Sequence, residues 1–159
     1  MQFRLVAGLI GLTTLILVGC VRPYQPAPEL VSGQHAELEI RSGSDATVPW
    51  GFVVQLYDYG DACPNAFSGG AKDSAYLGDL EVENEHDSIL VPIPADTNVF
   101  ILWSAGGPRG YHAAMHGFRP VAGRKYIVQL STDGGAGRWR FVDASTGSPV
   151  RIMDLGDCD

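Results

Sequence analysis

Hydrophobic and polar residues alternate along most of this chain, which predicts short β-strands with one buried face. Residues 36–41 read Ala-Glu-Leu-Glu-Ile-Arg, so every second side chain is apolar. Further on, Phe52, Val54 and Leu56 fall on one face of a second strand. The same period predicts strands at Trp50–Asp58, Tyr76–Glu83, Ser88–Pro94, Val99–Trp103, 126–130, 139–141 and Pro149–Met153.

Segments rich in glycine, proline, asparagine and aspartate separate these strands. The chain has 20 glycines and 10 prolines among its 159 residues, and such residues favour tight turns. About seven or eight strands with turns between them predict an all-β fold, either an antiparallel β-sandwich or a small barrel. Pro92 and Pro94 cannot donate a backbone hydrogen bond, so their strand is predicted to lie at a sheet edge.

The segment Tyr111–Phe118 allows two interpretations. Its Ala-Ala-Met core favours a helix, whereas the flanking glycines and neighbouring strands favour a strand or a short turn. On a helix, His112 and His116 would share a face and could ligate a metal, but the glutamate of a His-Glu-x-x-His motif is absent. On a strand they would lie roughly 13 Å apart and could not share an ion. We therefore expect no metal site here.

Pro120 and Gly123 shortly precede Tyr126 at the start of a predicted strand. This arrangement resembles the corner found in immunoglobulin-like and transthyretin-like sandwiches. The resemblance implies a sandwich of one of these two types.

The first twenty residues have a different character. Phe3 and Arg4 lead into an uncharged apolar run over residues 5–18, which is shorter than the roughly 20 residues of a membrane-spanning helix. Leu17-Val18-Gly19-Cys20 resembles the lipobox of bacterial lipoproteins. That resemblance implies cleavage before Cys20, a diacylglycerol on its thiol and an acyl chain such as palmitate on the new amine. The alternatives are an ordinary secretory signal or an anchor helix with a chance cysteine.

This resemblance divides the chain into three parts. We expect residues 1–19 to be a signal peptide that is removed, 20–35 to be the lipidated cysteine with a proline-rich tether, and 36–159 to form a single β domain. Val21 stands where enteric lipoproteins retained in the inner membrane have aspartate. The resemblance thus implies an outer-membrane lipoprotein, with its domain in the periplasm or at the cell surface.

Two further cysteines remain once Cys20 carries lipid. The periplasm is oxidising, so Cys63 and Cys158 are predicted to form a disulfide bond. Closing such a long loop would stabilise the fold by about 4–5 kcal/mol, less any strain.

Motifs for catalysis are missing from the sequence. There is no Gly-x-Ser-x-Gly elbow, and the glycine-rich stretch at 134–137 lacks the Lys-Ser/Thr of a phosphate-binding loop. We predict that the protein is not an enzyme and needs no cofactor or metal. A calcium site is a weaker alternative, and it would use the carboxylates of Glu81, Glu83, Glu85 and Asp87.

The formal net charge of −7 makes the protein a poor general partner for nucleic acid. Cationic residues nevertheless concentrate between 119 and 140, which predicts a patch for an anionic partner. We expect a structural or accessory envelope lipoprotein that contacts protein through a sheet edge. The alternative is a ligand-binding or inhibitor module for a glycan, a lipid headgroup or a lysozyme-type target. The residues of the predicted patch are Arg119, Arg124, Lys125, Arg138 and Arg140.

Overall fold

The computed structural model describes residues 23–26, 30, 33–42, 52–60, 76–82, 88–107, 110–133 and 136–153, without the side chains of 105–112 and 132–137. The elements of this described chain are all strands. In chain order they are β1 (His35–Ser42), β2 (Phe52–Asp58), β3 (Tyr76–Val82), β4 (Ser88–Pro94), β5 (Val99–Gly107), β6 (Gly110–Phe118), β7 (Lys125–Asp133) and β8 (Ala136–Asp143).

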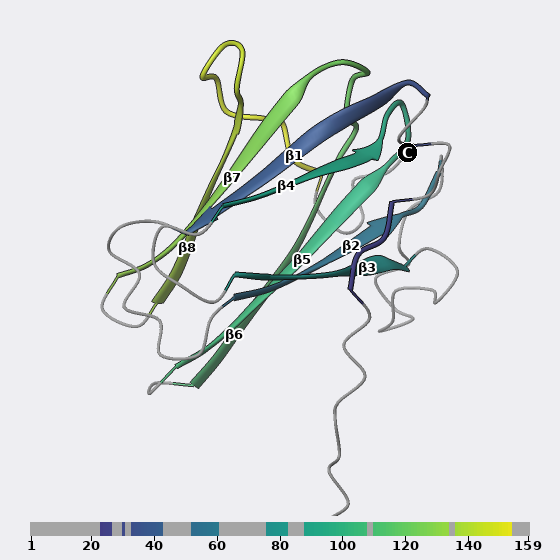
Figure 1. The fold of residues 1–159 in the computed structure, drawn as a ribbon. Coiled ribbons are helices and arrows are strands. Elements are labelled where there is room, and N and C mark those ends of the chain that lie inside the picture. The colour runs from purple at the N-terminus through teal and green to yellow at the C-terminus, as the bar shows by residue number, and fades with distance from the viewer. Residues whose placement is uncertain are drawn as a thin grey trace, which may run out of the picture.

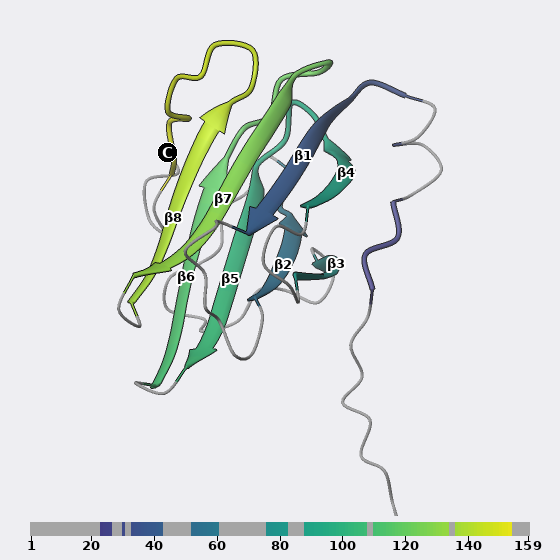
Figure 2. The same ribbon diagram turned by 60° about the vertical axis from the view of Figure 1, so that its left-hand side comes forward.

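The eight strands form two sheets that pack face to face (Figures 1 and 2). One four-stranded sheet has the order β4-β1-β7-β8, and the other has the order β3-β2-β5-β6. All pairs are antiparallel except β1 with β7. The predicted all-β sandwich is therefore confirmed, and neither sheet closes into a barrel. The first strand neighbours β4 and β7 and not β2.

Alternation along each strand explains where the core lies. The inward residues of β1, among them Leu38 and Ile40, have no exposed surface, and Val54 and Leu56 of β2 face them from the other sheet. Trp103 is also buried and packs edge-on against Phe52. A second buried cluster, Tyr57, Tyr59 and Phe100, covers part of the outer face of the sheet β3-β2-β5-β6.

Tyr111–Phe118 forms a strand. It lies within β6, which forms a hairpin with β5. The pairing is continuous from the pair Gly107 and Gly110 to the pair Val99 and Phe118. The helical preference of its alanines is overridden by this pairing, because a β5 edge left open would expose unpaired backbone groups. His112 and His116 are thus four positions apart on a strand, too far to share an ion.

Proline placement in β4 agrees with the prediction. Pro92 and Pro94 both lie on this strand, and β4 is an edge strand of its sheet.

The last predicted strand, Pro149–Met153, is wrong in detail. Its residues make two isolated bridges: Pro149 pairs with Val142 of β8, and Met153 pairs with Gly117 of β6. The segment crosses from one sheet to the other and therefore cannot run along either as a continuous strand. It covers the β6–β8 side of the sandwich.

The proline-rich tether is also more ordered than expected. Pro23 makes a parallel bridge to Asp79 on β3, and the Tyr24 amide donates to the Asp79 carbonyl at 2.9 Å. The Tyr24 hydroxyl donates to the carbonyl of Pro92 on β4. Residues 23–26 thus cover the β3–β4 side of the sandwich, opposite the side that residues 149–153 cover.

Candidate functional site

The outer face of the sheet β4-β1-β7-β8 carries a mixed cationic and apolar surface. Residues opposite one another on paired strands lie on the same face, so the strand register fixes its composition. We call this surface the basic face. Across β4, β1, β7 and β8, one row reads Leu90, Glu39, Ile127 and Val142, and the next reads Ser88, Arg41, Gln129 and Arg140, with Glu37, Lys125 and Arg138 in the flanking rows.

Glu39 is the centre of the polar network on this face. Its carboxylate accepts from Arg41 Nε at 2.5 Å and Nη2 at 2.9 Å, and from the Ser88 hydroxyl at 2.7 Å. Lys125 Nζ lies 2.7 Å from Oε2. The Glu39 side chain is 9% exposed although it points out of the sheet, because the longer neighbouring side chains cover it. Bonding to Arg41 above all, and then to Lys125 and Ser88, lowers the pKa of Glu39 to about 2.

Cationic charge exceeds anionic charge on the basic face. Among its described side chains, Arg41, Lys125, Arg138 and Arg140 stand against two carboxylates. Both arginines of β8 are exposed. In a molecule of net charge −7, this is a local reversal of sign.

Apolar side chains lie between these charges. Leu90 is 51% exposed, the highest value among the large hydrophobic residues of the described chain. Ile127 and Val142 are half-buried in the same row. The combination of exposed apolar area with arginine is typical of protein-binding surfaces.

The structure divides the predicted cationic patch between two places. Lys125, Arg138 and Arg140 lie on the basic face, as the alternation predicted. Arg119 and Arg124 lie at the end of the sandwich instead, where they line a depression of about 300 Å³ together with Arg151. Sequence reasoning missed Arg41, because the parallel pairing that brings β1 beside β7 joins segments far apart in the chain.

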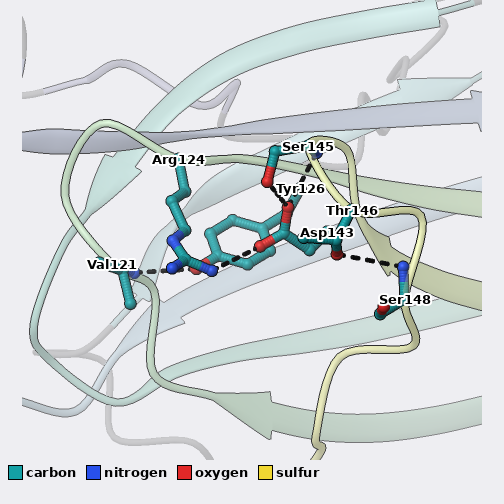
Figure 3. A network of polar contacts seen from close by, with 7 residues as sticks. All are labelled: Val121, Arg124, Tyr126, Asp143, Ser145, Thr146 and Ser148. Carbon is teal, nitrogen blue, oxygen red and sulfur yellow. Dashed lines mark hydrogen bonds and ion pairs between the residues drawn. The ribbon is translucent and has the colours of Figure 1, made fainter.

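The corner at the start of β7 is present. The Tyr126 hydroxyl accepts a hydrogen bond from the Val121 amide at 3.0 Å (Figure 3). Beside it, Arg124 Nη1 donates to Asp143 Oδ2 at 2.8 Å, and the amide of Ser145 donates to Asp143 Oδ1 at 2.8 Å. Bonding to the Ser145 hydroxyl and amide, and then to Arg124, lowers the pKa of Asp143 to about 2. This network closes the end of the sandwich, and it commits Arg124 to an internal partner.

Two of the three tryptophans can be placed, and both face the interior. Trp103 is buried in the core, and Trp139 stacks on the imidazole of His116 with ring centroids 4.0 Å apart. Trp139 comes from β8 and His116 from β6, so the stack lies between the sheets at the β6–β8 side. Neither ring forms an open platform for a sugar. Trp50 lies outside the described residues.

Several predicted sites lie outside the part of the chain that the structure describes. These are Cys20, both disulfide cysteines, Cys63 and Cys158, and the carboxylates of Glu83, Glu85 and Asp87. Within the described residues, no three His, Cys, Asp or Glu side chains are placed to hold a metal ion. Along the same residues, we find no helix with the length and apolar character needed to cross a membrane.

Comparison with known proteins identifies no family. No protein-family model matches the chain, and no curated protein matches it. Among solved structures, a candidate cell adhesion protein from Bacteroides ovatus matches at 13% identity with a TM-score of 0.39. The match covers 77% of this chain and 45% of that protein, so the chain spans less than half of its length. A likeness this distant carries no argument about function.

Proposed function

We propose that this protein is a lipoprotein of the bacterial outer membrane, anchored through Cys20, whose β-sandwich binds an acidic envelope protein and performs no catalysis. The observation that carries the proposal is the basic face, where arginine and lysine surround exposed apolar residues on an acidic protein. The anchor rests on the Leu17-Val18-Gly19-Cys20 motif.

A sheet face fits this role better than a sheet edge. Residues 23 and 24 pair with β3, 148–150 pair with β8, and Met153 pairs with β6. The edge strand β4 carries prolines that cannot donate to an added strand. The basic face, by contrast, lacks the buried aromatic cluster that covers part of the outer face of the sheet β3-β2-β5-β6. We therefore propose contact through this face, whereas contact through a sheet edge was expected from the sequence.

Charge sets the kind of partner. Glu39 neutralises part of the charge of Arg41 and Lys125. Arg138 and Arg140 are exposed on β8 and add further cationic charge. An acidic protein surface with a few apolar side chains complements this pattern. A glycan is less well supported, because the placed tryptophans face the interior.

A second function is supported by one separate observation. Three arginines, Arg119, Arg124 and Arg151, line the depression together with one carboxylate, Asp143. Such a site could hold a small anion, as a ligand-binding module would. Arg124 is already paired with Asp143, so we rank this function below partner binding.

The proposal is tested by capture of partners from envelope extracts with matched charge reversals. Arg138→Glu with Arg140→Glu should abolish capture at physiological salt, since the attraction depends on this face. Arg119→Glu with Arg151→Glu makes the same charge change in the depression and should leave capture intact. Equal loss in both variants would show that only net charge matters, and loss in the second alone would favour the small-anion site. If Arg138→Glu with Arg140→Glu lost only the binding to protein-free anionic vesicles, the partner of the basic face would be a lipid surface and not a protein.

A further inference from the structure

Residues 23–26 are built into the sandwich by a specific fit. Gly78 on β3 has φ of +146°, and a Cβ placed there would lie 2.4 Å from the Tyr24 Cα and 2.7 Å from its amide nitrogen. An alanine at this position would therefore collide with backbone, which cannot move aside cheaply. The sequence keeps a glycine in the middle of a strand at the one point where the segment crosses it.

The side chain of Tyr24 extends this fit to the other sheet. Its ring packs against the main core cluster, and its hydroxyl donates to the Pro92 carbonyl on β4. Burial, and then the charge of Asp58, raises the pKa of Tyr24 to about 12. Tyr24 thus contacts β3 through its backbone and β4 through its side chain. These contacts hold the segment across the β3–β4 side. We call residues 23–26 the strap.

We infer that the strap fixes how the domain stands on the membrane, with the β3–β4 side against the bilayer. This inference rests on the proposed lipid anchor at Cys20. Pro23 follows Cys20 by three positions, and a fully extended chain spans about 3.3–3.6 Å per residue. The anchor can therefore lie no more than about 10 Å from Pro23, which pairs with Asp79 on β3. A free tether that began to fold only at Gln34 would reach roughly 40 Å.

In this orientation the basic face stands roughly perpendicular to the membrane surface. Strands in a sheet are about 4.8 Å apart, so β8 stands about 14 Å farther from the bilayer than β4. That distance exceeds the Debye length of about 8 Å at physiological salt. Arg138 and Arg140 thus lie out of effective electrostatic range of the protein's own membrane.

Charge does not hold the β3–β4 side against the lipid. Asp79 and Glu81 on β3 and Asp58 on β2 are acidic, and anionic headgroups repel them. Proximity comes from the covalent anchor and the strap. The orientation should consequently be insensitive to salt, unlike a domain that docks through a basic surface.

The test uses the full-length lipidated protein in vesicles that contain lipids with a nitroxide on the headgroup. A fluorophore is attached at position 81 or 152 through a genetically encoded azide, which leaves the native cysteines unchanged. Glu81 is exposed on β3, and Ile152 is exposed on the opposite side. The label at 81 should be quenched severalfold more strongly than the label at 152, and to the same extent at low and high salt.

Two variants examine the strap itself. Gly78→Ala displaces it by collision, and Tyr24→Ala removes its side-chain contacts without touching β3. Both should bring quenching at 81 down to the level at 152. Equal quenching of the two labels in the native protein, stronger quenching at 152, or unchanged quenching at 81 in both variants would overturn the orientation.

Mass spectrometry of the same samples separates this inference from the proposed function. If Cys20 carries fatty acid and the labels fail to differ, the orientation is wrong while the anchor stands. If Cys20 carries none, the anchor is wrong and the orientation falls with it.

Discussion

Lys125 on β7 and Glu39 on β1 meet across the parallel pair of strands, with Nζ 2.7 Å from Oε2. Glu39 also receives Arg41 and the Ser88 hydroxyl, which lies on β4. One carboxylate thus ties together three adjacent strands of the sheet on its outer face. The same contact holds Lys125 and Arg41 in fixed positions within the basic face.

Glu39→Gln should destabilise the fold by about 1–3 kcal/mol, because it removes charge-assisted hydrogen bonds and leaves two cations beside a neutral amide. Chemical denaturation at pH 7 measures this. Glu37→Gln, the same change two residues away on the same face, is the matched control and should cost less. Equal loss in the two variants would contradict a central role for Glu39.

The pH dependence of stability should also change in this variant. The pKa of Glu39 is about 2 in the folded protein against an ordinary 4.5, so the unfolded chain binds its proton more readily. The stabilisation is complete above pH 4.5 and is lost as the pH falls through about 2. Glu39→Gln should lose less stability than the native protein between these values. Asp143, whose pKa is also lowered to about 2, keeps its own share of the acid dependence.

The corner gives a second prediction. Tyr126→Phe keeps the ring packed against Phe118 and Phe141 but removes the acceptor of the Val121 amide. We expect the free energy of unfolding to fall by about 0.5–1.5 kcal/mol. Hydrogen exchange at the Val121 amide should become faster than in the native protein, whereas exchange at amides in the centre of β7 should change less. Unchanged exchange at Val121 would show that the hydroxyl does not hold the corner.

A third prediction concerns Gly117 on β6. A Cβ there would lie 2.4 Å from Cε1 of the Phe100 ring, which has no exposed surface. Gly117→Ala should therefore cost about 1–3 kcal/mol through overpacking. Adding Phe100→Leu should recover part of that loss, because a smaller side chain makes room. A double variant whose losses simply add would contradict the steric explanation.

Tyr24 can be monitored directly. NMR titration of ring-labelled tyrosine should give Tyr24 a pKa of about 12 in the native protein. Gly78→Ala should return this value toward 10.0, because displacing the strap exposes the phenol to water.

Much of the fold could be predicted from alternation alone. Ser88–Pro94 was placed with the bounds that the structure gives, and its prolines indicated the edge. Tyr111–Phe118 could not be decided, because its alanines favour a helix and only pairing with β5 settles it as a strand. The strap was missed since a short proline-rich segment has no period to detect. Its one signal in the sequence is Gly78, a glycine inside an apolar strand.

The candidate site was predicted less completely, for a physical reason. Alternation placed Arg138 and Arg140 outward, but it could not say which distant strand would lie beside them. The β1–β7 pairing places Arg41 and Glu39 on the same face as the β7 and β8 cations. Arg124 instead pairs with Asp143 at the end of the sandwich. Strand order, which depends on contacts between remote segments, decides the composition of a sheet face.

The most direct test of partner binding is photocrosslinking in intact cells. A photoreactive amino acid replaces Gln129, which is exposed at the centre of the basic face, and a second strain carries it at Thr146, which is exposed in the turn after β8. We predict a discrete protein adduct from position 129 that disappears with Arg138→Glu and Arg140→Glu, and none from position 146. No protein adduct at 129, or the same adduct from both positions, would contradict the proposal that this face binds a protein.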